Sequence, residues 1–493
     1  MSLLSRLRRS GMALALLTGL GAAGAAPASA VEVVGVRLPL LGEILTARTS
    51  ELRSAEALWA GDSDLAELNR ATDGRIARAI ANLVHEPLPQ QDFQSSAMVQ
   101  QLEVLLSQLV QVDQLPGRRL DAKPVVAAME RLRAGGQEVT LLNVLAEIPA
   151  SKVTIRLDRA LPVLQDLKRD KLRLEAQLAR YPMLPSATDA ALRSGPAAIR
   201  TSSTRLQLDS GRETLEVVVV RPTGAATLPP VVISHGLWDS PDSFLGWARH
   251  LASHGAPVFL PRHPGSDISQ QAEMLAGRTP PPDPSEFLRR PADVRAVLDA
   301  LDRGSLAGGE GVKASGVVMI GHSWGGTTAL QLAGARSLPA PLWSSCSDAA
   351  SPQRNISWVL QCSFLPAATP QSQADPRIAR VVAVSPPQGL VFEQGVKDLQ
   401  VPVLLVSGSS DFVVPTQPEA LVPFALFPGS TSRLVVAERG SHFNLPAGAA
   451  SNGGPLRALL LRWVNQPAVA PDSGLTDPKG LPLRLVPASA LRP

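Results

Sequence analysis

The sequence predicts an α/β protein in which a mainly helical N-terminal domain precedes a doubly wound, mostly parallel sheet. In the second half of the chain, short continuous apolar runs alternate with helical patterns. Strands of this kind are typical of a parallel sheet that is covered on both faces. The predicted parallel strands are residues 231–234, 257–260, 316–320, 380–384, 401–406 and 433–436, and two further strands at 204–208 and 215–220 precede them.

The length and composition fit a multidomain globular protein without a strong charge bias. The chain has 493 residues, of which 45% are apolar, so two or three domains and a sizeable core are expected. Three of its 47 basic side chains, Arg6, Arg8 and Arg9, lie in a segment that we expect to be removed. That leaves 44 basic side chains against 43 acidic ones, a balance that gives no electrostatic reason to expect a nucleic-acid partner.

The first thirty residues are typical of a secretory signal peptide. A basic stretch at residues 6–9 precedes an apolar stretch at 11–26 and the small residues Ala28-Ser29-Ala30. This layout predicts cleavage after Ala30 and export, so that the protein is periplasmic or secreted. The alternative is an uncleaved membrane anchor, although the apolar stretch is shorter than the ~20 residues that a membrane span needs.

Residues 31–195 are expected to form the mainly helical domain and a linker. The segments with apolar residues at helical spacing are 75–84, 98–112, 125–132 and 161–181. Residues 153–157 instead alternate like a short strand, and His85, the only histidine in this half, is expected to be structural. No catalytic constellation is visible in the domain. Its role therefore stays open between contact with a membrane surface, with a partner and with a second copy.

The domain that carries the sheet is expected to span residues 196–466. Two stretches interrupt its alternation of strands and helices, a Pro-rich one at 267–284 and another at 337–375. Insertions at strand ends commonly form lids or substrate walls. The last stretch, 467–493, is rich in Pro and Ala and is expected to be a poorly ordered tail.

Cys346 and Cys362 are the only cysteines in the sequence. In an exported protein, an even pair this close in sequence indicates a disulfide that closes a short loop, and two free buried thiols are the alternative. The chain-entropy treatment assigns such a loop about 3 kcal/mol of stabilisation.

The strongest chemical signal is the sequence Gly321-His-Ser323-Trp-Gly325-Gly, which lies between a predicted strand and a helical pattern. A sharp turn at this place holds a serine in strained backbone geometry with its hydroxyl exposed, and the glycines let neighbouring backbone pass closely. The helix that starts there also directs free backbone N–H groups at the reacting centre. We therefore predict that Ser323 is a nucleophile.

A serine hydroxyl needs a base, and on this kind of turn the partners follow in the chain order Ser, acid, His. His442 is the only histidine after Ser323, so we predict it as the general base. Asp411 follows the strand at 401–406 and precedes His442 by 31 residues, and we predict it as the acid that orients the imidazole. The competing acids are Glu393, Asp398 and Glu419, which close no buried strand, and Asp375, which begins one.

Two backbone N–H groups are expected to hold the oxyanion, those of Trp324 and Leu237. Leu237 lies in the loop His235-Gly-Leu-Trp238 after a predicted strand, for which an ordinary turn is the alternative. Each such donor typically changes turnover ~10²–10³-fold. Candidate substrate contacts are Trp238, His263 and Phe443, and a structural role for His263 is equally open. The histidines show no metal-site spacing, so neither a metal nor a cofactor is expected.

These motifs together resemble the α/β-hydrolases. They are Ser-His-Gly at 234–236, His-Ser-Trp-Gly-Gly at 322–326, Gly-Ser-Ser-Asp at 408–411 and Ser-His-Phe at 441–443. Over nearly all of the predicted mature chain, including residues 141–158, the sequence is similar to the cyanobacterial-type α/β-hydrolases that carry an N-terminal helical domain of unknown function. It is more distantly similar to platelet-activating-factor acetylhydrolases and dienelactone hydrolases.

The sequence departs from the acetylhydrolases at two places. Their nucleophile is followed by Phe, where this chain has Trp324, and their acid follows the preceding strand, which here ends in residues 384–387 without a carboxylate. The second departure favours Asp411 and weakens any transfer of phospholipid specificity. The resemblance implies a carboxylesterase or lipase-like serine hydrolase that acts on a small-molecule ester or lipid through an acyl-enzyme. The alternatives are a non-catalytic binding protein on the same fold and an acyltransferase.

Overall fold

The computed structural model describes residues 31–37, 44–75, 77, 85, 97–98, 101, 110–112, 128–129, 131–132, 134–148, 150–156, 169, 171–208, 214–276, 278–337, 346 and 355–491. The predicted signal peptide lies outside the described residues, as does part of the insertion at 337–375. The chain divides into two compact units. The first comprises residues 1–167, 271–283 and 344–354, and the second comprises 168–270, 284–343 and 355–493.

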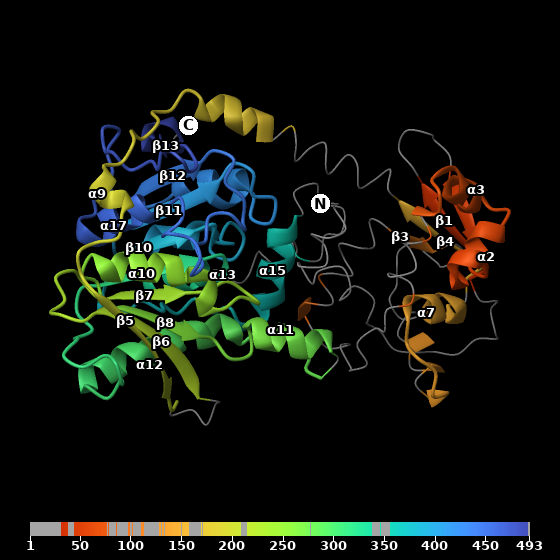
Figure 1. The fold of residues 1–493 in the computed structure, drawn as a ribbon, viewed down its shortest axis with the longest axis horizontal. Helices are drawn as coiled ribbons and strands as arrows, with labels where there is room; N and C mark the ends of the chain where they lie inside the picture. The colour runs from red at the N-terminus through yellow and green to blue at the C-terminus, as the bar shows by residue number, and fades with distance from the viewer. Residues whose placement is uncertain are drawn as a thin grey trace. The chain divides into compact units, whose positions relative to one another are not determined.

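The first unit is built around a small mixed sheet. Its strands are β1 (Val33–Arg37), β2 (Ile44–Arg48), β3 (Val110–Val112) and β4 (Lys152–Arg156), in the order β2-β1-β4-β3 (Figure 1). Only β1 and β4 run parallel. The accompanying helices are η1 (Glu51–Arg53), α2 (Ala55–Ala60), α3 (Asp64–Ala71) and α7 (Leu141–Glu147).

The expectation of a mainly helical N-terminal domain was therefore wrong. The alternation at residues 153–157 correctly indicated β4, but β3 lies at the end of a segment that was expected to be helical. β1 pairs with β4 from more than a hundred residues away, between Val34 and Val153 for example. Local periodicity carries no information on such a pairing.

The second unit contains a nine-stranded sheet that confirms the predicted α/β class. Its strand order is β13-β12-β11-β10-β9-β7-β8-β6-β5 (Figure 1). The strands are β5 (Ile199–Leu206), β6 (Leu215–Pro222), β7 (Val231–Ser234), β8 (Val258–Arg262), β9 (Val317–His322), β10 (Ile378–Val384), β11 (Val403–Gly408), β12 (Arg433–Ala437) and β13 (Leu483–Val486). β7 to β12 are parallel, and antiparallel strands close both edges.

Helices cover both faces of this sheet. Val318 and Ile320 of β9 share an apolar cluster with α10 and α17, whereas Val317 and Met319 are buried on the other face because successive strand residues point to opposite sides. The helices and single turns of the unit are α9 (Asp189–Leu192), η2 (Pro241–Phe244), α10 (Leu245–Ser253), α11 (Ile268–Leu275), α12 (Glu286–Arg303), α13 (Trp324–Leu332), α15 (Ile356–Phe364), η3 (Leu365–Ala367), η4 (Glu393–Asp398), η5 (Gln417–Leu421), α16 (Val422–Phe424), α17 (Arg457–Asn465) and η6 (Ala488–Ala490), of which α11 extends into the residues of the first unit.

The last stretch of the chain belongs to the core, which corrects the expectation of a poorly ordered tail. β13 pairs with β12, and Val469, Leu475 and Leu483 are buried in the same apolar cluster as α10 and α17. The Pro and Ala content concealed a short edge strand whose apolar residues are too few to form a periodic pattern.

A proline inside α12 links this helix to α13. Pro291 has no backbone N–H, so the carbonyl of Phe287, four residues earlier, lacks its usual helical partner. The buried Gln331 side chain of α13 donates to this carbonyl at 3.0 Å. Because α13 directly follows β9, the bond fixes α12 against the part of the unit that carries the predicted nucleophile.

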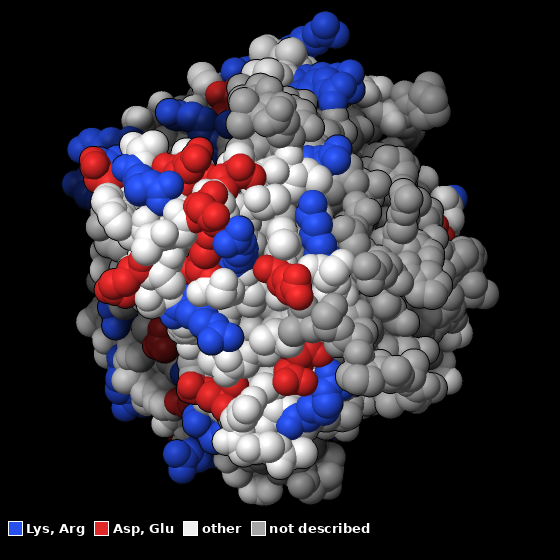
Figure 2. Space-filling model, turned by 90° about the vertical axis from the view of Figure 1, so that its right-hand side faces the viewer, with Lys and Arg blue, Asp and Glu red and all other residues white. Residues whose placement is uncertain are grey.

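Several further features bear on the predictions from sequence. The two cysteines form a disulfide, as predicted. None of the helices that the structure describes is long and apolar enough to span a membrane. On the face shown in Figure 2, basic and acidic side chains are interspersed among the described residues, which fits the near-balance of charge in the sequence.

The buried imidazole of His250 on α10 makes stability depend on pH. Burial, together with the nearby charges of His254 and Arg457, lowers the pKa of His250 to about 4. In the unfolded chain its pKa is about 6.5, so unfolding takes up a proton once the pH falls below that value. The free energy of unfolding should thus decrease from pH 7.5 to pH 5.5, with about 1.3 kcal/mol of the loss due to His250.

Urea unfolding of the parent protein and of His250→Gln at these two pH values measures this contribution. The variant should lose about 1.3 kcal/mol less than the parent on acidification. Equal losses in the two proteins would show that His250 is not held neutral by the fold.

Candidate active site

The predicted site residues follow the carboxyl ends of neighbouring parallel strands. The chain passes from β7 to β8 on one side, whereas β9 lies on the other side of β7. At such a switch point the loops after the two central strands diverge and leave a crevice where ligands bind in open α/β sheets. Ser323 follows β9, and the loop 235–237 follows β7. Asp411 and His442 follow β11 and β12 at the same edge.

Ser323 sits on a strained turn between β9 and α13. Its φ of 54° and ψ of −127° are unfavourable for a residue with a side chain. A side chain on Gly325 would collide with the carbonyl oxygen of Ser234, and one on Gly321 would collide with that of Gly325. Backbone packing therefore requires a glycine at both positions, as the sequence pattern predicted. The amide of Ser323 donates to Val384 O at 2.8 Å and anchors the turn to β10.

Asp411 and His442, which were predicted as the acid and the base, are hydrogen-bonded to each other. His442 Nδ1 lies 2.9 Å from Asp411 Oδ2, and both side chains are buried. The other carboxylate oxygen of Asp411 accepts the amides of Val413 and Val414, at 3.0 and 2.8 Å. With both oxygens engaged, the carboxylate is fixed in position and accepts a hydrogen bond from the Nδ1–H group of His442. Nε2 is then the free basic nitrogen of this imidazole.

The imidazole of His442 lies beside the turn that carries the serine. Its ring centroid is 4.7 Å from that of His322, the residue before Ser323. Ser323 Oγ itself makes no hydrogen bond to a residue that the structure describes. The structure thus joins Asp411 to His442 and brings His442 to the turn that carries Ser323, while no Ser323–His442 hydrogen bond is formed. Such bonds commonly tighten only when substrate is present.

His322 is held as a neutral neighbour of His442. Burial, and after it the charge of His442, keep the pKa of His322 well below its usual value. A second positive charge beside His442 is therefore disfavoured, which is compatible with His442 becoming protonated during a reaction.

The two predicted oxyanion donors are available for a ligand. Among the described residues, neither the amide of Leu237 nor that of Trp324 donates to a protein acceptor. The side chain of Ser323 lies close to this loop, because a Cβ on Gly236 would lie 3.1 Å from the Cβ and 3.6 Å from Oγ of Ser323. The Trp324 ring is buried against Phe364, with centroids 4.4 Å apart, so only its backbone faces the site.

The three candidate substrate contacts differ in how exposed they are. Phe443 is 65% exposed and lies beside Phe412, which is 52% exposed, with ring centroids 6.3 Å apart. Trp238 is partly buried, and its Nε1 donates to Gln270 at 2.8 Å. His263 is fully buried, which favours the structural role over the substrate contact, the two interpretations that the sequence left open.

His263 belongs to a second row of serine, histidine and aspartate. Ser234 Oγ lies 2.8 Å from His263 Nε2, and His263 Nδ1 lies 3.0 Å from Asp293 Oδ2. The three residues are 0%, 0% and 1% exposed, respectively. This row has the composition of a catalytic triad, but no substrate reaches a serine buried in this way. The sequence analysis assigned no role to Ser234 or Asp293. The available signal was Ser234 itself, a polar residue at the end of the otherwise apolar strand β7.

The competing acid Glu419 is hydrogen-bonded through both carboxylate oxygens. Its carboxylate accepts bonds from Ser357, Gln361 and the amides of Gln388 and Gly389, at 2.7 to 2.9 Å. Burial raises the pKa of Glu419. The residue thus ties α15 and the loop after β10 to η5, with its oxygens already occupied.

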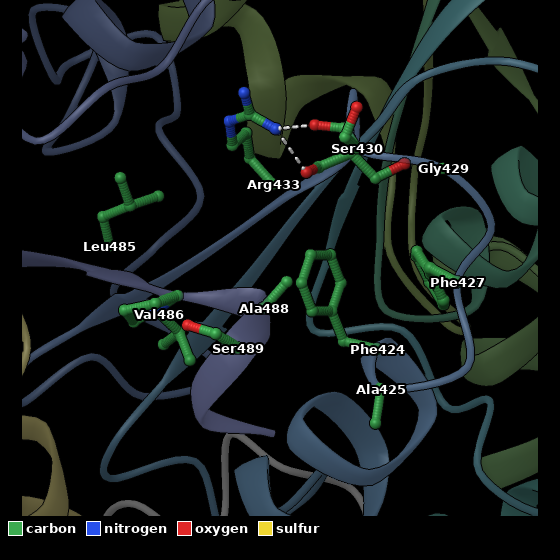
Figure 3. Close-up of a pocket in the computed structure, with 12 residues that line it drawn as sticks. Phe424, Ala425, Phe427, Gly429, Ser430, Arg433, Leu485, Val486, Ala488 and Ser489 are labelled. Atoms are coloured by element: carbon green, nitrogen blue, oxygen red, sulfur yellow. Dashed lines mark hydrogen bonds between the residues drawn. The ribbon is translucent and has the colours of Figure 1, made fainter. Parts of the chain in front are cut away.

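A cavity of about 570 Å³ lies away from these residues, near the amino-terminal end of β12. Figure 3 shows Phe424 pointing into it, with Arg433 hydrogen-bonded to the carbonyl of Ser430. Asp411 and His442 lie at the opposite ends of their strands, so this cavity is not part of the candidate active site. In the described part of the chain, no group of three or more His, Cys, Asp or Glu residues is arranged to hold a metal ion.

Comparison with known proteins agrees with the topology. Residues 229–341 match the alpha/beta hydrolase fold family, over a segment that runs from β7 to α13 and contains the loop 235–237 and Ser323. The match covers residues 229–341, and the largely parallel nine-stranded sheet of the second unit is consistent with the alpha/beta hydrolase fold. No curated protein matches the sequence.

Proposed function

We propose that this protein is an exported serine hydrolase that cleaves carboxylic esters, with Ser323 as nucleophile. The main support is the coincidence of a strained serine at the start of α13 with the hydrogen-bonded Asp411–His442 pair at the same sheet edge. The disulfide supports export, because such bonds persist in oxidising compartments. The finer resemblance to cyanobacterial-type hydrolases, and contact with a membrane surface, stay expectations.

The proposed reaction passes through an acyl-enzyme. His442 Nε2 takes the proton of Ser323 as Oγ bonds to the ester carbonyl carbon, and the carbonyl oxygen becomes an oxyanion held by the amides of Leu237 and Trp324. When the oxyanion collapses, the alcohol leaves with the proton from His442. Water, deprotonated by the same imidazole, then attacks the acyl group, and the acid is released as Ser323 regains its proton.

An apolar acyl or aromatic group is the proposed substrate feature. Phe412 follows the acid Asp411 directly, and Phe443 follows the base His442. Two exposed, neighbouring aromatic rings at these positions form an apolar rim beside the reacting atoms. Exposed apolar clusters of this kind commonly mark ligand contacts.

The choice between the two serine rows is tested by Ser323→Ala and Ser234→Ala. With p-nitrophenyl butyrate, Ser323→Ala should lower kcat at least about 10³-fold and abolish labelling by a fluorophosphonate. Ser234→Ala loses one buried hydrogen bond, which costs about 1 kcal/mol of stability, but should still be labelled. Loss of labelling in Ser234→Ala together with its retention in Ser323→Ala would reject the assignment of the nucleophile.

The apolar rim is tested with esters of increasing acyl length. Replacing both Phe412 and Phe443 by Ala should lower kcat/KM for p-nitrophenyl octanoate about 10-fold, because each buried methylene is worth about 0.8 kcal/mol, and leave the acetate ester within about twofold. Met183→Ala, at an exposed apolar residue that bridges to β13, is the control and should change neither value. Equal losses for both esters would show that the rim does not contact the acyl chain.

A further inference from the structure

Arg290 of α12 is a buried cation that donates three of its four hydrogen bonds to backbone carbonyls. The residue is 0% exposed, and no carboxylate lies within ion-pair distance of it among the described residues. Its counter-charges, Glu286, Asp293, Asp267 and Asp239, act from farther away. Burying a guanidinium in this way is costly unless each donor finds an acceptor. The acceptors therefore indicate what the residue holds in place.

The main acceptors are the two successive carbonyls of the loop after β7. Arg290 Nη1 donates to His235 O at 2.6 Å, and Nη2 donates to Gly236 O at 3.0 Å. The remaining bonds go to Ser266, from Nη2 to its carbonyl at 3.1 Å and from Nε to its Oγ at 2.9 Å. Ser266 Oγ in turn donates to Glu286 at 3.0 Å, which fixes the guanidinium plane.

His235 reinforces the same arrangement from inside the loop. Its Nε2 accepts the amide of His263 at 3.0 Å, so Nδ1 carries the proton and donates to Gly236 O at 2.7 Å. Burial, and after it the charge of Arg290, keep the pKa of His235 well below its usual value, so the ring is neutral. Gly236 O thus receives two donors, and the peptide that it belongs to is held by both.

Holding these carbonyls sets the direction of the amides that follow them. In a trans peptide the C=O and N–H groups point in opposite directions, and the chain has no cis peptide bond among its described residues. With His235 O and Gly236 O both bound to one guanidinium, the amides of Gly236 and Leu237 point away from Arg290. Successive amides on one side form a concave anion site. Ser323 is adjacent to this loop, 3.1 Å from the Cβ position of Gly236.

We propose that Arg290 is the positioning residue of the oxyanion hole, orienting the Gly236–Leu237 peptide so that the Leu237 amide faces the oxygen that forms at the Ser323 adduct. The inference rests on the proposed function, in which Leu237 is an oxyanion donor. Arg290 does not touch the substrate. Its effect is exerted on the transition state through one amide, and binding of the uncharged ester in the ground state is little changed.

The test compares Arg290→Lys with Arg295→Lys. Lysine keeps the charge at position 290 but lacks the fork that spans two carbonyls. Arg295 lies on the same helix and bonds to Gln373, so the same substitution there is the matched control. With p-nitrophenyl butyrate, kcat per active site should fall about 100-fold in Arg290→Lys, with KM within about threefold, and stay unchanged in the control. Active sites are counted by stoichiometric fluorophosphonate labelling, which removes misfolded enzyme from the comparison.

A crystal structure of Arg290→Lys supplies a readout that needs no turnover. The Gly236–Leu237 peptide should be rotated or present in two orientations, while the Asp411–His442 pair is unchanged. If Arg290→Lys does not fold, Ser266→Ala, which removes the acceptor of Nε, is measured in its place and should lower kcat about 10-fold. An unrotated peptide with kcat per site within twofold of the parent would overturn the proposal. An inactive parent protein would reject the proposed hydrolase function, and the peptide orientation would still decide the role of Arg290.

Discussion

The close backbone packing around Ser323 is the constraint on which the rest of the site depends. A side chain on Gly325 would collide with the end of β7, and one on Gly321 would collide with the backbone of Gly325 within the turn itself. Within this turn Ser323 has a positive φ, and the loop 235–237 lies beside its side chain. Packing within the turn and against β7 thus accompanies the strained backbone of Ser323 and keeps this residue close to the loop that holds the Leu237 amide. The closeness of this turn to the loop after β7 follows from the parallel pairing of β7 with β9 at the switch point of the sheet.

Buried polar groups make the loops around this contact rigid. Arg290 and His235 fix the carbonyls after β7, and Glu419 fixes the loop after β10. The row from Ser234 through His263 to Asp293 satisfies the polar groups between β7, β8 and α12. In each case a side chain on one element holds the backbone or a side chain of another. In the proposed reaction, such rigidity means that little reorganisation is needed when charge develops on the substrate, which is the main source of electrostatic catalysis.

The sequence predicted what is local or follows a fixed chain order. The strand at 231–234 was found with its exact bounds, and the Ser323 turn and the Asp411–His442 pair were found from spacing and position at strand ends. The small N-terminal sheet and β13 were missed because their pairing partners are distant in sequence or their runs are too short. Arg290 and the buried serine row were missed because their roles depend on contacts between residues that lie up to 55 positions apart in the sequence. By residue type alone, Arg290 and Asp293 are typical of a solvated helix face.

The most direct test of a serine hydrolase site at the β7–β9 switch point is the crystal structure of the protein after reaction with an alkyl fluorophosphonate. The phosphorus should be bonded to Ser323 Oγ, with one phosphonyl oxygen about 2.7–3.1 Å from the amides of Leu237 and Trp324. His442 Nε2 should then lie about 2.6–3.2 Å from Ser323 Oγ or from the alkoxy oxygen of the adduct, with its bond to Asp411 intact. An adduct on any other residue, or a phosphonyl oxygen turned away from both amides, would contradict the assignment.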